Sequence, residues 1–229
     1  MLLIVAKEDR YINNLLEKIN NTKETVKNIN IYNCTYMDHN FLIATTNYGK
    51  VNVSSALSYI INKYKISVIT YIGTCQSINN NLDILSAVIY KGSVQYDIDY
   101  CPLGIKSGML PYMKNEEFLT NHDLNECMRE ICKKYNINYN TDLIASADMF
   151  VSNNNLARSI KTCYNASSID DCSGTIGQIA YLNNIPYVGI CIVSSYANFN
   201  AVKLYNTYEE EAISICQKIA YKFINEYYS

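Results

Sequence analysis

Short, almost wholly apolar runs spaced along the chain constrain its fold more than any other feature. They lie at residues 2–6, 41–46, 67–72, 84–90 and 187–193. Each run is too short for a typical buried helix and is too continuously apolar for a strand with one wet face. Such runs are typical of parallel strands that are covered on both faces.

Segments with helical periodicity lie between these runs. Apolar residues recur at three- and four-residue steps from Val53 to Tyr64, and less regularly from Ile176 to Leu182. Thr207 and Glu210 form a capping-box sequence, which predicts that a long C-terminal helix begins there. Alternation of strands and helices predicts an α/β fold, a three-layer α/β/α sandwich with a central mixed, largely parallel sheet, in one domain over residues 1–229.

Composition excludes several classes of protein. The formal net charge is −2 and 17% of residues are charged, which argues against a nucleic-acid-binding surface. Nine cysteines, an odd number without any C-x-x-C pair, favour reduced thiols in a cytoplasmic protein and no structural metal. Residues 1–6 are too few for a signal peptide, and no apolar run approaches the ~18 residues of a membrane span. We therefore expect a cytoplasmic protein with no membrane partner.

Polar residues follow the expected strands at four places, residues 73–77, 146–153, 170–174 and 194–198. Ligands of such sheets bind at the carboxyl ends of the strands. Residues 73–77 are interpreted either as an ordinary tight turn or as backbone that meets an anion or a ribose hydroxyl. Asp170 and Asp171 either cap the next helix or face the sugar of a ligand.

A thiol nucleophile is not expected. Cys172 and Cys191 would need a neighbouring base, and the two histidines, His39 and His122, lie in polar segments typical of loops or helix caps.

Several stretches match one known family in order and spacing. They are Gly49-Lys50-Val51-Asn52, Ile72-Gly73-Thr74, Asp97-Ile98-Asp99 with Gly108-Met109-Leu110-Pro111, Ser146-Ala147-Asp148-Met149-Phe150-Val151, and Ile169-Asp170-Asp171-Cys172-Ser173-Gly174 with Asn184-Ile185-Pro186-Tyr187. These stretches resemble the 5′-methylthioadenosine/S-adenosylhomocysteine nucleosidases, within the purine nucleoside phosphorylase superfamily. The resemblance covers nearly the whole chain and implies a nucleoside phosphorylase-like fold.

The resemblance also implies that the catalytic positions of the family are substituted. The family cleaves an N-glycosidic bond: an aspartic acid protonates the purine, and one glutamate binds ribose hydroxyls while another activates water. Here the aspartate position is Ser195, and the arginine that precedes it in the family is Cys191. The ribose-binding glutamate is Cys172, beside Asp171. A serine hydroxyl is far too weak an acid to protonate a purine, so hydrolysis should be weak or lost.

The N-terminal glutamate of the family corresponds to Tyr11 or Arg10. A phosphorylase activity is not implied either, because the arginine that holds phosphate in those relatives corresponds to Tyr71.

The base-binding part of the family's pocket is retained. Phe150 and the Val151 backbone match the purine-binding segment, and Tyr205 falls near a second aromatic residue, so a purine has a surface on which to stack. The ligand-binding residues implied by the resemblance are Thr74, Cys75, Phe150, Val151, Asp171 and Tyr205.

Three functions remain open from the sequence. The first is a protein that binds a purine nucleoside or adenine with weak or no hydrolysis. The second is an active nucleosidase in which Asp171, Glu8 or Asp9 replaces a missing carboxylate. The third is a non-catalytic structural or interaction protein with a filled pocket. In each case we expect no cofactor, and the resemblance implies a homodimer in which residues 97–111 meet the partner.

Overall fold

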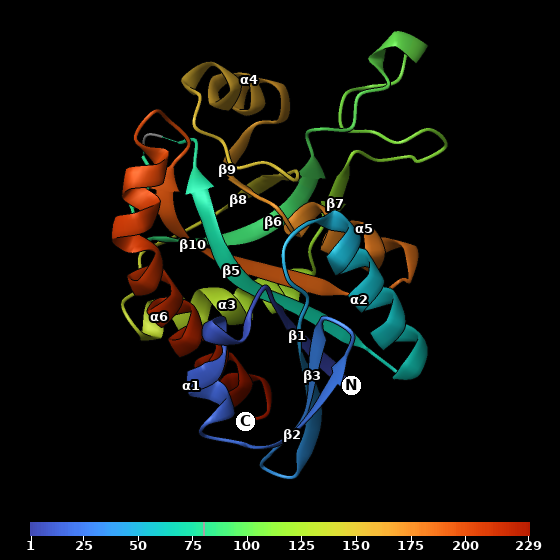
Figure 1. Cartoon of the computed structure of the whole chain (residues 1–229), viewed down its shortest axis with the longest axis vertical. Coiled ribbons are helices and arrows are strands. Elements are labelled where there is room, and N and C mark those ends of the chain that lie inside the picture. Colours follow the sequence, from blue (N-terminus) through green and yellow to red (C-terminus); the bar gives the residue numbers. More distant parts are fainter. Residues whose placement is uncertain (80) are drawn as a thin grey trace.

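The computed structural model describes residues 1–79 and 81–229, and Figure 1 shows its course. The strands are β1 (Leu2–Ala6), β2 (Asn20–Val26), β3 (Ile29–Tyr36), β4 (His39–Thr45), β5 (Val68–Ser77), β6 (Ala87–Gln95), β7 (Glu117–Leu119), β8 (Tyr139–Ser146), β9 (Ala166–Asp170) and β10 (Tyr187–Tyr196). The helices are α1 (Asn13–Leu16), α2 (Lys50–Lys63), α3 (His122–Lys134), α4 (Asn154–Tyr164), α5 (Ser173–Leu182) and α6 (Ala201–Tyr227), with short 3-10 turns η1 (Asp9–Tyr11) and η2 (Cys101–Leu103).

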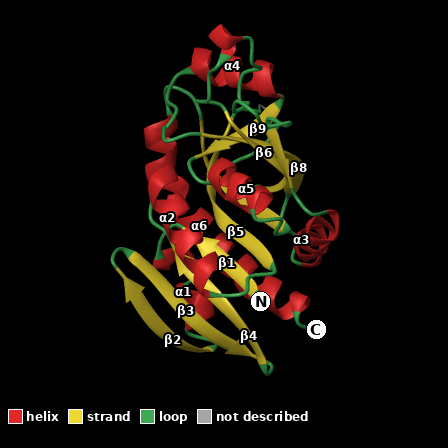
Figure 2. Ribbon diagram, turned by 90° about the vertical axis from the view of Figure 1, so that its right-hand side faces the viewer, coloured by secondary structure: helices red, strands yellow, loops and turns green. Residues whose placement is uncertain are grey.

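The strands form one mixed sheet that curls on itself. Strand β1 lies between β4 and β5, both parallel to it, and β5 also pairs in parallel with β10. From β10 the sheet continues antiparallel to β6 and then through β8 to β9, which returns to pair with the end of β5. Half of the sheet is thus a closed ring, while β4, β3 and β2 extend from it as an antiparallel ribbon (Figure 2).

Side chains of β1 show how the layers are built. Leu2 and Ile4 pack against α1, α3 and α6 on one face, whereas Leu3 and Val5 pack against α2 and α5 on the other. A third apolar cluster joins α4 to β8 and β9 at the end of the ring. Because helices cover both faces, the central strands are buried throughout. The predicted α/β sandwich with a central mixed sheet is confirmed.

The turn predicted at residues 73–77 is wrong, because these residues are the second half of β5. Gly73 pairs with Cys191 of β10, and Ser77 pairs with Tyr196 of the same strand. The cross-strand partner therefore fixes this segment as strand, although its own residues are typical of a turn. Gly73 is needed for close packing, since a Cβ there would lie 2.5 Å from the Tyr71 hydroxyl.

The start predicted for the last helix is also wrong. Helix α6 begins at Ala201, whose side chain is buried, and not at Thr207. Thr207 lies inside the helix, where its hydroxyl donates to the Lys203 carbonyl over 2.9 Å instead of capping a terminus.

Within residues 1–79 and 81–229, no helix combines the length and apolar character that a membrane span needs. The same residues contain no cluster of three or more His, Cys, Asp or Glu side chains that could hold a metal ion.

Candidate functional site

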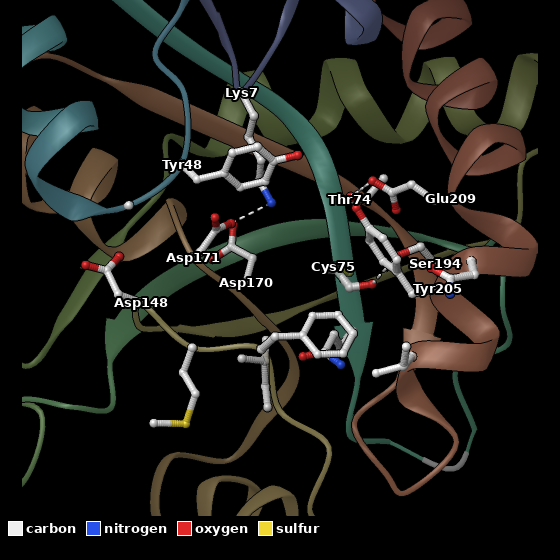
Figure 3. Close-up of a pocket in the computed structure, with 17 residues that line it drawn as sticks. Lys7, Tyr48, Thr74, Cys75, Asp148, Asp170, Asp171, Ser194, Tyr205 and Glu209 are labelled. Carbon is white, nitrogen blue, oxygen red and sulfur yellow. Dashed lines mark hydrogen bonds and ion pairs between the residues drawn. The ribbon is translucent and has the colours of Figure 1, made fainter.

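A cavity of about 630 Å³ opens where the carboxyl ends of β1, β5, β9 and β10 meet the N-terminal half of α6 (Figure 3). Its walls come from segments far apart in sequence. They comprise Lys7, Tyr48, Gly49, Thr74, Cys75, Gln76, Asp148, Met149, Phe150, Ile169, Asp170, Asp171, Ser194, Val202, Tyr205, Asn206 and Glu209.

Aromatic side chains form one end of this cavity. The Phe150 and Tyr205 rings meet edge to face, with centroids 5.6 Å apart and planes at 82°. Phe150 keeps 46% of its surface exposed, so its ring is available to a flat ligand. Thr74 lines the same cavity, which agrees with the expectation that residues of β5 and Phe150 share one cleft.

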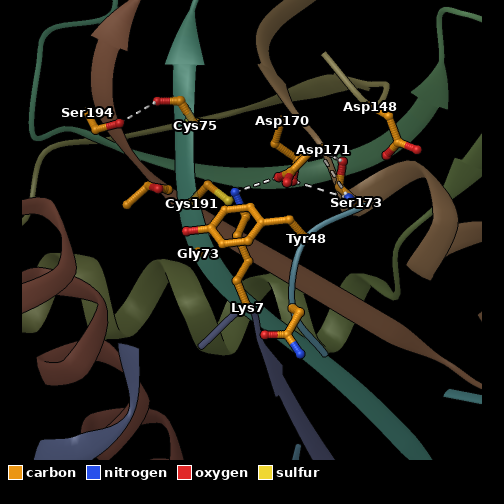
Figure 4. Close-up of polar contacts among 12 residues, drawn as sticks. Lys7, Tyr48, Gly73, Cys75, Asp148, Asp170, Asp171, Ser173, Cys191 and Ser194 are labelled. Carbon is orange, nitrogen blue, oxygen red and sulfur yellow. Dashed lines mark hydrogen bonds and ion pairs between the residues drawn. The ribbon is translucent and has the colours of Figure 1, made fainter. Parts of the chain in front are cut away.

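A buried ion pair lies on the β1 side. Lys7 Nζ is 2.5 Å from Asp171 Oδ1, and the Lys7 ammonium lies 5.2 Å from the centroid of the Tyr48 ring (Figure 4). Burial alone would lower the Lys7 pKa, but attraction to Asp171, together with smaller contributions from its other acidic neighbours, raises it. The Lys7 ammonium therefore stays charged, and it neutralises the Asp171 carboxylate.

Asp170 caps the next helix, which is the other role considered for the Asp170–Asp171 pair. Its carboxylate accepts hydrogen bonds from the Ser173 hydroxyl at 2.6 Å and from the Ser173 backbone N–H at 3.1 Å, which caps α5. Burial and the neighbouring Asp171 raise the Asp170 pKa from 3.8 to about 6. Both residues line the cavity, but Asp170 is engaged with the start of α5, whereas Asp171 is engaged with Lys7.

Glu209 is a cavity residue that the sequence did not indicate. It lies on α6, is 5% exposed, and its Oε1 accepts from the Tyr11 hydroxyl at 2.8 Å and from the Thr74 hydroxyl at 3.3 Å. No donor among the described residues bonds to Oε2. In the sequence, Glu209 lies between Thr207 and Glu210, in the segment predicted to begin the last helix. Because α6 begins at Ala201, Glu209 lies within the helix.

Gln76 is a second such residue. Its side-chain Nε2 donates to the Val151 carbonyl and its Oε1 accepts from the Val151 N–H, both over 2.8 Å. Val151, which the resemblance makes a base-binding residue through its backbone, is buried and is not among the lining residues. No local pattern signals this contact, because it joins residues 75 positions apart.

The substituted catalytic positions lie behind the cavity wall. Ser195, Cys172 and Cys191 have no exposed surface and do not line the cavity. The Ser195 hydroxyl lies 3.4 Å from Gln76 Nε2, and its neighbour Ser194 lines the cavity instead. A shift in register between β5 and β10 falls at this point.

Both thiols are held in their neutral form. Burial raises the pKa of Cys172 and of Cys191 well above the ordinary value of a thiol. Cys191 Sγ lies 2.6 Å from the Tyr90 hydroxyl, which is buried beside it in the core.

Glu8 and Asp9, considered as substitutes for the N-terminal glutamate, are held outside the cavity. Glu8 Oε2 is 2.8 Å from Arg10 Nε. Asp9 accepts hydrogen bonds from Tyr32 at 2.7 Å and from Thr45 at 2.9 Å, which lowers its pKa despite partial burial. Of the carboxylates considered as substitutes, Asp171 alone lines the cavity.

Curated proteins with similar sequences are nucleosidases. The 5′-methylthioadenosine/S-adenosylhomocysteine nucleosidase of Buchnera aphidicola subsp. Schizaphis graminum (strain Sg) is 28% identical over 200 residues, which cover 86% of this chain and 85% of that protein. The nucleosidase of the same description from Staphylococcus aureus (strain JH9) is 25% identical over 222 residues, with coverages of 96% and 97%.

Several solved structures have a similar fold. The futalosine hydrolase of Helicobacter pylori strain 26695 has a TM-score of 0.93 at 18% identity, over 98% of this chain and 97% of its own. A protein from Borrelia burgdorferi B31, assigned as a 5′-methylthioadenosine/S-adenosylhomocysteine nucleosidase and bound to adenine, has a TM-score of 0.89 at 25% identity, over 98% and 99%. The family model "Phosphorylase superfamily" matches residues 1–227. The chain therefore belongs to the phosphorylase superfamily, as its resemblance to the nucleosidases predicted.

Proposed function

We propose that the cavity binds a purine nucleoside of the methylthioadenosine or adenosylhomocysteine type, and that hydrolysis of the N-glycosidic bond is weak or lost. The base would stack at the Phe150–Tyr205 end. The sugar would then lie toward Thr74 and Glu209, because Glu209 follows Tyr205 by one turn of α6. The names of the relatives, and the adenine bound in one of them, support this class of ligand.

The burial of Ser195 carries the proposal that hydrolysis is weak. At the position where the family has its acid, this chain has a hydroxyl with no exposed surface, beside Gln76. A hydroxyl does not protonate a purine leaving group near neutral pH. Loss of a general acid alone removes a factor of about 10² to 10⁴ in rate.

Calorimetric titration tests the binding half of the proposal. Adenine and 5′-methylthioadenosine should each bind at one site per chain. Phe150→Ala should weaken both, because the stacking surface is removed. Met149→Ala is a matched control in the same loop, since Met149 lines the cavity without taking part in the aromatic contact. Absence of binding to the unmodified protein would contradict the proposal.

An active nucleosidase is the second candidate, because Asp171 lines the cavity and reaches Lys7. It predicts measurable adenine release by the unmodified protein and its loss in Asp171→Asn. The ion pair with Lys7 counts against it, since Oδ1 of this carboxylate is already engaged by Lys7 Nζ at 2.5 Å. The third reading, a filled pocket in a purely structural protein, is disfavoured by the open volume of about 630 Å³.

A further inference from the structure

The contact between Gln76 and Val151 closes a backbone edge at the base end of the cavity. Val151 lies in the loop between β8 and α4, directly after Phe150, and both of its backbone polar groups bond to the Gln76 amide at 2.8 Å. The orientation of the amide follows from chemistry, because a backbone N–H only donates and a carbonyl only accepts. Gln76 is 6% exposed and lines the cavity.

The Val151 N–H and carbonyl that Gln76 covers can bond only to a group with a particular arrangement of donor and acceptor. Val151 offers one donor beside one acceptor, so its partner must place an acceptor beside a donor. A primary amide does this, and so does adenine, whose ring nitrogen lies next to its 6-amino group. A purine that lacks the amino group and is substituted at N9, as in a nucleoside, has only the acceptor. The Gln76 side chain therefore holds the position that the reading edge of an aminopurine would take against Val151.

We propose that Gln76 determines the base specificity of this cavity by occupying the hydrogen-bonding edge of Val151. The inference rests on the proposed binding of a purine beside Phe150. While the Gln76 amide is bonded to Val151, the Val151 carbonyl cannot accept from the 6-amino group of a ligand. Adenine and unsubstituted purine then bind with similar affinity, by stacking. A ligand that displaced the amide would leave the buried Gln76 side chain without its partners, which is costly.

Removal of the amide should create selectivity for adenine. In Gln76→Ala, and in Gln76→Gly, the Val151 N–H and carbonyl are left for the ligand. Adenine satisfies both groups, whereas purine leaves a buried carbonyl unpaired. An unpaired buried group of this kind reduces affinity about 5- to 150-fold. Gln76→Ala is the primary variant, because it keeps a side chain within β5.

The experiment is a titration of adenine and purine in their 9-methyl forms, which carry neither a glycosidic bond nor an N9–H beside N3, into the unmodified protein and the variants. We expect an affinity ratio within about twofold in the unmodified protein and at least about fivefold in favour of adenine in Gln76→Ala. Gln178→Ala is the matched control, since it removes a glutamine side chain of α5 that accepts from Gln95 over 2.6 Å and does not line the cavity. Its ratio should equal that of the unmodified protein.

Two results would overturn the inference in different ways. An adenine-to-purine ratio that is the same in the unmodified protein and in Gln76→Ala, with both bases bound, removes the role of Gln76 but leaves the proposed function standing. If neither base binds to any of the proteins while their thermal unfolding remains cooperative, the proposed purine site itself fails.

Discussion

At the scale of single residues, small side chains stand at the positions where the resemblance places catalytic residues, and tyrosine rings pack near one of them, Cys191. Tyr90 bonds to Cys191, and its ring packs 6.4 Å from that of Tyr71. The phenols of both tyrosines have raised pKa values because they are buried, so these groups stay neutral. Cys191 is therefore closely packed against Tyr90 in the core, and a side chain as long as arginine would displace that ring.

Replacement of Cys191 by arginine should destabilise the fold. Cys191→Arg places a long charged side chain in a fully buried site against Tyr90, and we expect a loss of at least about 3 kcal/mol in the free energy of unfolding. Cys191→Ala, which keeps the packing of the strand, should lose less. Urea unfolding of the two variants measures the difference. Equal stability of Cys191→Arg and the unmodified protein would contradict this account.

Glu209 should contribute to recognition of the sugar. Glu209→Gln removes the charge from a carboxylate that Thr74 and Tyr11 hold in the cavity, and we expect binding of 5′-methylthioadenosine to weaken about tenfold while adenine binding is unchanged. Glu210→Gln is the control, because that side chain is 84% exposed on the same helix. Equal weakening of both ligands would show that Glu209 acts on the fold and not on the sugar.

At the scale of elements, the sequence pattern predicts the strands that are apolar throughout and the helices whose apolar residues recur at regular steps. Strand β1 matches its run, and β10 and α2 begin within three residues of their predicted starts. The hairpin of β2 and β3 was not predicted, because most of β2 is exposed and polar and its strand character comes from pairing with β3. The aromatic end of the site followed from motif positions, whereas Gln76 and Glu209 did not, since their partners are distant in sequence.

The cap of α5 predicts a pH dependence of stability. Folding raises the Asp170 pKa from 3.8 to about 6, so the folded state binds this proton more tightly than the unfolded state. The stabilisation is fully present below about pH 4 and is lost as the pH rises through 6, a change of about 3 kcal/mol.

Asp170→Asn should remove this dependence, because asparagine still accepts a hydrogen bond at the cap but does not titrate. The measurement is the free energy of unfolding of both proteins between pH 4 and pH 7. Relative to Asp170→Asn, the unmodified protein should lose stability across this range. A difference between the two proteins that does not change with pH would contradict the raised pKa.

At the scale of the whole molecule, residues 97–111 form a green loop that projects from the sheet (Figure 1). Leu103 is 73% exposed and Tyr100 is 38% exposed; nearby, just beyond the segment, Tyr112 is fully exposed. Exposed apolar segments of this kind mark interaction surfaces. We predict a homodimer that buries this segment, and sedimentation at micromolar concentration should give twice the mass of the chain. Leu103→Glu should shift the equilibrium to monomers, and a monomeric unmodified protein would contradict the prediction.

Adenine release is the measurement that tests the central claim, binding without efficient hydrolysis, most directly. The unmodified protein and the Staphylococcus aureus nucleosidase would be assayed side by side with 5′-methylthioadenosine at saturating concentration. We predict that this chain binds the nucleoside but releases adenine at least about a thousandfold more slowly, because Ser195 supplies no proton to the leaving purine. Turnover within about tenfold of the Staphylococcus aureus enzyme would contradict the claim.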